Sequence, residues 1–143
     1  MDGFLGTSAK LGSDLALVSS LVLAAVAAFG VWRGRRRRIS IHCPIMATAA
    51  LLHWIPVLAI MIPAWLAAAG GNSKLTGPLS LVPIFHGLLG GFTQLLMTYT
   101  VTRMYWVERL PPEKPIWLMR TTAIFWLLTI TGGIAVYLVT YVL

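Results

Sequence analysis

The side chains in this sequence that are best suited to bind a metal are three histidines, one cysteine and a nearby methionine. His42, Cys43 and Met46 lie within one short stretch. On a helix Met46 follows His42 after one turn and lies about 40° from it around the axis. Imidazole and soft sulfur donors suit Cu(I) or haem iron better than Mg²⁺ or Ca²⁺. We therefore treat His42, Cys43 and Met46 as candidate metal ligands.

His53 and His86 are candidate ligands of a haem b, because an ionisable residue inside a membrane span is a functional candidate. At about 1.5 Å of rise per residue, their expected depths in the bilayer differ by about 12 Å. Two imidazoles on one iron need nearly equal depth, so this pair requires tilted helices. Two alternatives stay open: haem or copper bound by other combinations, including His42 with Met46, and histidines that only bond to a neighbouring helix.

The composition places the chain among integral membrane proteins. Of its 143 residues 58% are hydrophobic and 10% are charged. Four apolar segments reach the length of about 20 residues that a bilayer-spanning helix needs. The first lacks a preceding basic stretch and an Ala-x-Ala type site, so we expect it to be retained as a span. The sequence predicts a single all-α domain over residues 1–143, a four-transmembrane-helix bundle. The expected spans are residues 15–32, 43–69, 79–106 and 118–143.

A block of five arginines that ends at Arg38, shortly before His42, predicts how the bundle crosses the membrane. Basic residues beside a span favour the cytoplasmic side, so we expect the N- and C-termini on the outer side of the cell membrane. The net charge of +7 comes mainly from this block, which lies where anionic lipid would bind it, and nucleic acid is not an expected partner. The expected contacts of anionic lipid are Arg33, Arg35, Arg36, Arg37 and Arg38.

Prolines and polar residues predict local features of the helices. Ser13 or Asp14 is expected to cap the first span. In the second span Pro44 falls in the first turn and is harmless there, whereas Pro56 and Pro63 each remove a backbone hydrogen bond and are expected to kink the helix.

One stripe of the third span is expected to face the interior of the bundle, because its members recur at helical spacing. Glycines in this span favour close helix packing. The stripe consists of His86, Gly90, Thr93, Met97 and Thr100.

The sequence lacks the residue arrangements that pumps and hydrolytic enzymes need, and this limits the functions that we expect. We expect no Asp or Glu at membrane depth, although proton-coupled pumps and antiporters depend on such groups. No constellation for nucleophilic or paired-carboxylate catalysis is present. A non-catalytic role is favoured, and the question of an enzymatic activity stays open.

From His42 to Tyr137 the chain resembles the small membrane family catalogued as domain of unknown function 420. The resemblance depends on His42 with Met46, His86-Gly87, the Thr-rich stretch from Thr98 to Met104, Pro115-Ile-Trp to Trp126, and Thr131-Gly132-Gly133-Ile-Ala-Val-Tyr137. It implies a four-helix bundle connected with aerobic respiration, and family members described as assembly factors of haem-copper oxidases have histidines proposed to handle haem or metal. The chain departs from the family pattern in lacking a histidine between Lys114 and Arg120.

These features lead us to expect a small accessory or assembly protein of a respiratory haem-copper oxidase. Oxidase subunits and the lipid bilayer are its expected partners, and haem b or copper its candidate cofactor. Two alternatives stay open: a b-type cytochrome subunit that relays electrons, and a purely structural subunit of a larger membrane complex.

Overall fold

The computed structural model describes residues 3–70, 81–106 and 113–142, and the regular elements in these ranges are all helical. Four helical segments are long and apolar enough to cross a membrane, as predicted, and the second of them is continuous from Ile39 to Ala69. The chain is therefore an all-α, four-span bundle. The elements are α1 (Leu11–Arg35), α2 (Ile39–Pro56), the π-helical η1 (Val57–Met61), α3 (Ile62–Ala69), α4 (Leu81–Trp106) and α5 (Glu113–Tyr141).

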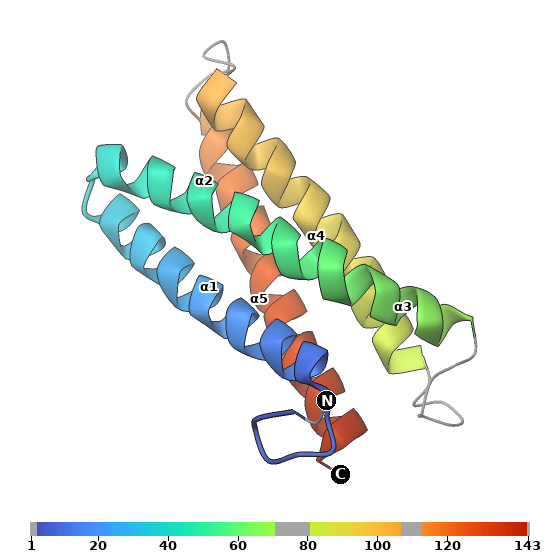
Figure 1. Cartoon of the computed structure of the whole chain (residues 1–143). Coiled ribbons are helices and arrows are strands. Elements are labelled where there is room, and N and C mark those ends of the chain that lie inside the picture. The colour runs from blue at the N-terminus through green and yellow to red at the C-terminus, as the bar shows by residue number, and fades with distance from the viewer. Residues whose placement is uncertain (1–2, 71–80, 107–112, 143) are drawn as a thin grey trace.

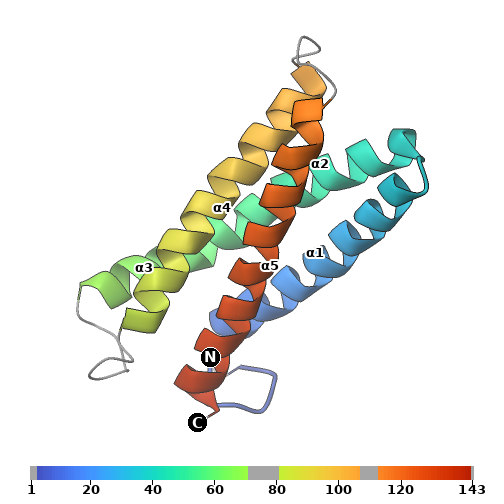
Figure 2. The ribbon, with the colours of Figure 1, turned by 180° about the vertical axis from the view of Figure 1, so that it is seen from behind.

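Two antiparallel hairpins make up the bundle. One pairs α1 with α2–η1–α3, the other pairs α4 with α5, and packing is most extensive within each pair. Figure 1 shows the two chain ends at one end of the bundle, and the α1–α2 turn at the other, together with the end of α4 and the start of α5. We call these the termini end and the arginine-rich end. The hairpins diverge toward the arginine-rich end, as Figure 2 shows from behind.

The proline-containing span has a local change of helix type between Pro56 and Pro63. Residues Val57–Met61 form a π-helix, and the amide of Ile62 donates to the carbonyl of Val57. A proline removes one backbone donor and crowds the carbonyl four residues before it, and one wider turn accommodates this defect. Because α2 begins at Ile39, Pro44 lies in its second turn and not, as predicted, in the first.

Hydroxyl pairs join α4 to α5 on the face predicted to point inward. Thr93 bonds to Thr129 at 2.9 Å, and Thr100 bonds to Thr122 at 2.8 Å. The two rungs are seven residues apart on each helix, which returns to the same face after two turns. Thr93, Met97 and Thr100 are buried, which confirms the predicted inward stripe in this part of α4.

Indole groups join the two hairpins. Trp54 Nε1 donates to Thr98 Oγ1 at 3.0 Å, and Trp65 Nε1 donates to the carbonyl oxygen of Ile84 at 3.1 Å. Trp65 lies against Gly87, where a Cβ atom would overlap its ring. The Gly87 position therefore needs glycine, because the Trp65 ring occupies the space of a side chain.

The N-terminal segment folds back onto the termini end, and Asp14 holds it there. Asp14 lies inside α1, which begins at Leu11 with Lys10 as its N-cap and no side-chain cap bond, so the prediction that Ser13 or Asp14 caps the helix is wrong. The fully buried Asp14 carboxylate accepts the amides of Phe4 (2.7 Å) and Leu5 (2.9 Å) and the hydroxyl of Tyr137 (2.5 Å). One acidic residue is therefore buried within the first span, although it lies in the first turn.

Candidate functional site

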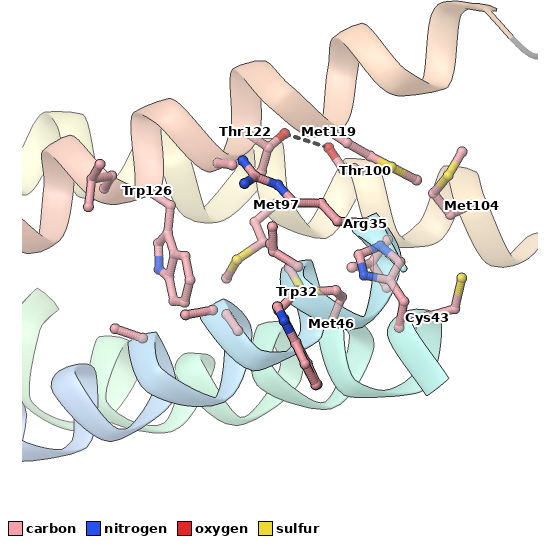
Figure 3. A pocket seen from close by; sticks show the side chains of 18 of the residues that line it. Trp32, Arg35, Cys43, Met46, Met97, Thr100, Met104, Met119, Thr122 and Trp126 are labelled. Atoms are coloured by element: carbon pink, nitrogen blue, oxygen red, sulfur yellow. Dashed lines mark hydrogen bonds between the residues drawn. The ribbon is translucent and has the colours of Figure 1, made fainter. Parts of the chain in front are cut away.

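A cavity of about 450 Å³ lies at the arginine-rich end, where the two hairpins diverge. Its volume falls in the range of small-molecule sites, about 300–1,000 Å³. All of α1, α2, α4 and α5 contribute to its wall, and Figure 3 shows their side chains. The lining residues of α1 and α5 include exposed ones, such as Trp32 and Leu127, whereas Met97 and Thr100 of α4 are buried. The cavity therefore reaches the surface between α1 and α5.

The three candidate metal ligands all line this cavity. His42, Cys43 and Met46 come from the first two turns of α2. Three further methionines, which our sequence reasoning did not select, complete a set of imidazole and sulfur donors on three helices. In Figure 3 the side chains of Cys43, Met104 and Met119 gather at one end of the view, and that of Met97 lies toward the other. The additional methionines are Met97, Met104 and Met119.

One sequence signal could have identified part of this set. Met104 follows Met97 by seven residues, so it lies on the stripe of α4 that we expected to face inward. Met119 could not be found in this way, because its position depends on how α4 and α5 pair. In the part of the chain that the structure describes, no three His, Cys, Asp or Glu side chains are close enough to hold a metal ion. A metal in this cavity would therefore need methionine sulfur as a ligand.

His42 is fixed in one orientation by α1. Its Nδ1 lies 2.8 Å from the carbonyl oxygen of Gly30, and because a carbonyl only accepts, Nδ1 carries the proton. Nε2 is therefore the ring nitrogen that could bind a metal, and metal-binding histidines commonly have their other ring nitrogen fixed by such a hydrogen bond.

Two glycines of α1 make room for this contact. A Cβ atom on Gly34 would lie 2.9 Å from His42 Nδ1, and one on Gly30 would lie 2.9 Å from Met46 Sδ. The spacing Gly30-x-x-x-Gly34 is a known pattern of close helix approach, and it is the signal in the sequence that we did not use.

His53 is buried in the middle of the bundle and does not line the cavity. Gln94 Nε2 donates to the carbonyl oxygen of Ala50 at 3.3 Å, which leaves its Oε1 to accept from His53 Nδ1 at 2.8 Å. The Trp126 ring stands at 83° to the imidazole, with the ring centres 6.4 Å apart. These contacts hold α2 against α4 and α5, which is a structural role.

His86 lies elsewhere, toward the termini end of α4. Its ring packs against Gly132 and Gly133 of α5, and its buried Nδ1 has no hydrogen-bond partner among the described residues. Eight residues separate His86 from Gln94, the partner of His53, which corresponds to about 12 Å along α4. The structure therefore does not bring His53 and His86 to one centre where both could bind the same haem iron.

The arginines beside the cavity differ in their surroundings. The guanidinium of Arg36 lies 4.6 Å from the centre of the Trp32 ring, and that of Arg33 lies 5.4 Å from the ring centres of Trp32 and Phe29. Arg35 lines the cavity. Its side chain has no hydrogen-bond, ion-pair or aromatic partner in the described ranges.

Comparisons with protein-family models, with curated proteins and with solved structures give no match to this chain. The resemblance to the family of domain of unknown function 420 thus stays a prediction from the sequence.

Proposed function

We propose that this multi-pass membrane protein is a non-catalytic accessory protein that holds Cu(I) or haem iron in the cavity at its arginine-rich end. The observation that carries the proposal is the set of one imidazole, one thiol and four thioether groups around a single cavity. Thiol and thioether ligands select Cu(I), and imidazole and thioether groups are axial ligands of haem iron.

The cavity supports a ligand role for these groups over simple packing. Methionines often fill irregular gaps in apolar cores, so four of them in one region would be unremarkable if they filled the space. Here they surround a cavity, and the bond to the Gly30 carbonyl uses Nδ1 of His42, so Nε2 is the ring nitrogen left for a metal. Such a bond to a neighbouring helix also suits a histidine that only packs, but a metal ligand gains affinity when its ring is held in this way.

The cellular role that we propose is the assembly of a respiratory haem-copper oxidase, with oxidase subunits as partners. The sequence motifs from His42 to Tyr137 support this part of the proposal. We also propose that anionic lipid of the cell membrane binds the basic block on its cytoplasmic side, because these side chains carry concentrated positive charge next to a span. Its residues are Arg33, Arg35, Arg36, Arg37 and Arg38.

Substitutions of Met46 and His42, with a third substitution as control, test the metal proposal. The purified protein is titrated with Cu(I) against a chromogenic chelator and, separately, with haem while its Soret band is recorded. Met46→Leu and His42→Ala should weaken binding about tenfold or more, in line with the loss of one ligand or its support. Met61→Leu is the matched control, because Met61 lies in η1 outside the cavity. Equal binding by Met46→Leu and Met61→Leu would contradict the proposal.

A deletion experiment tests the proposed role in respiration. Cells that lack this protein should contain an oxidase without its copper or haem, and the Met46→Leu protein should restore it less well than the Met61→Leu protein. A fully loaded oxidase in the deletion strain would refute the assembly role. If the protein then copurified in fixed ratio with another complex, the structural alternative would hold.

A further inference from the structure

The wall of the cavity combines an apolar interior with one positive charge at its surface. Alanine, methionine and tryptophan side chains form most of the wall, and no acidic residue lines it among the described residues. Arg35 is exposed and is the cationic residue of the lining set, and Figure 3 shows its side chain extending over the cavity. Its guanidinium can therefore meet an anion that occupies the cavity.

The neighbouring arginines are not equivalent to Arg35. Arg33 and Arg36 lie over aromatic rings, so part of their binding capacity is already used. Arg38 is exposed but does not line the cavity. No side-chain partner engages the Arg35 guanidinium in the ranges 3–70, 81–106 and 113–142, and a guanidinium binds a carboxylate or phosphate through two parallel hydrogen bonds.

The position of the opening indicates where a ligand comes from. Ala28 of α1 and Ala123 and Leu127 of α5 line the cavity and are exposed, and all belong to helices long and apolar enough to cross a membrane. The opening between these helices thus faces the bilayer, and a molecule dissolved in the membrane reaches the cavity sideways.

We infer that the cavity binds an anionic amphiphile from the bilayer, with its apolar body among the methionines and alanines and its acid group on Arg35. Binding of this ligand requires no metal, so it can be tested independently of the metal proposal. Two sources share this chemistry: a lipid with an acid group, such as a fatty acid, and a planar ring system that carries carboxylates, such as a porphyrin.

Oleate and oleyl alcohol form a matched pair of probes, because they differ in charge at one end. Binding is measured by titration of the protein in nanodiscs of uncharged or zwitterionic lipid. Arg35→Gln should bind oleate about tenfold more weakly than wild type, the loss expected for a hydrogen-bonded charge pair, and oleyl alcohol equally well. Arg120→Gln removes the same charge at an exposed position outside both the cavity and the basic block, and it should bind both probes as wild type does.

Two further variants test whether the apolar part of the ligand lies in the cavity. Ala28→Leu and Ala123→Leu add bulk at exposed lining positions, where the fold has room for it, and each should weaken the binding of both probes. Circular dichroism and size-exclusion elution check that these variants fold. Equal oleate binding by Arg35→Gln and Arg120→Gln would overturn the inference, as would unchanged binding in both leucine variants.

Metal-free protoporphyrin distinguishes the two sources. Tighter binding of this dicarboxylate than of oleate, weakened in Arg35→Gln but not in His42→Ala, supports a porphyrin as ligand. Tighter binding of oleate supports a lipid acid. Failure of Cu(I) and haem to bind, with oleate binding intact, would remove the metal proposal and leave this inference in place.

Discussion

Replacing Gln94 with leucine should destabilise the bundle, because it leaves a donor of His53 without a partner. Gln94 is 2% exposed and His53 is 6% exposed. Leucine is apolar and similar in length to glutamine, but it lacks the acceptor that lies 2.8 Å from His53 Nδ1. It also removes the donor to the Ala50 carbonyl, which the helix already engages through its own backbone bond.

The expected size of the effect follows from the burial of this pair. A hydrogen bond between membrane helices is worth about 0.6 kcal/mol on average, which sets the lower end. A buried donor left unsatisfied costs about 1–3 kcal/mol. We therefore expect Gln94→Leu to lower the free energy of unfolding by about 0.6–3 kcal/mol, and His53→Leu to do the same. The double variant should lose less than the sum of the two, because it leaves neither partner unpaired.

The assay is unfolding in mixed micelles with a rising fraction of a denaturing detergent, followed by tryptophan fluorescence. Thr102→Val on the same helix is the control, because Thr102 is exposed and its loss should change stability by less than about 0.5 kcal/mol. If Gln94→Leu were as stable as Thr102→Val, or if the losses of the two single variants simply added, the argument that these groups are bound partners would be wrong.

Three further changes have outcomes that the structure specifies. Gly34→Ala places a Cβ atom 2.9 Å from His42 Nδ1, so it should weaken Cu(I) or haem binding in a titration while circular dichroism stays unchanged; full binding would contradict the close contact. Asp14→Ala should speed hydrogen exchange in residues 3–9, measured by mass spectrometry, because the carboxylate holds two amides there, and unchanged protection would count against this role. Thr129→Val breaks one hydroxyl pair between α4 and α5, and the micelle assay should show a loss of about 0.6 kcal/mol; a loss of several kcal/mol would refute a simple packing role.

The fold was predictable from the sequence because membrane spans follow from length and hydropathy alone. The four spans lie where we expected them, but α1 and α2 each begin four residues before the predicted position, at Leu11 and Ile39. The extensions are Leu-Gly-Ser-Asp and Ile-Ser-Ile-His, and the polar residues in them lower the hydropathy although they continue the helix. Helix ends depend on backbone bonds and caps, which hydropathy does not describe.

The site was predictable only where its residues share one helix. His42, Cys43 and Met46 are neighbours on α2, so helical spacing was enough to group them. The cavity arises where two hairpins diverge, and that divergence depends on crossing angles and on small residues such as Gly34.

Hydrogen-bond partners that are far apart in the sequence could not be predicted from helical spacing either. Asp14 was read as a cap because it follows a serine, yet its hydroxyl partner Tyr137 lies 123 positions away. Only the packing of α1 against α5 brings these two groups together.

X-ray absorption at the copper edge of the Cu(I)-loaded protein shows which side chains bind the metal. We expect a coordination shell that contains both sulfur and imidazole nitrogen. The nitrogen should be lost in His42→Ala and one sulfur in Met46→Leu, with no change in Met61→Leu. The same coordination shell in all these variants would mean that neither His42 nor Met46 is a ligand.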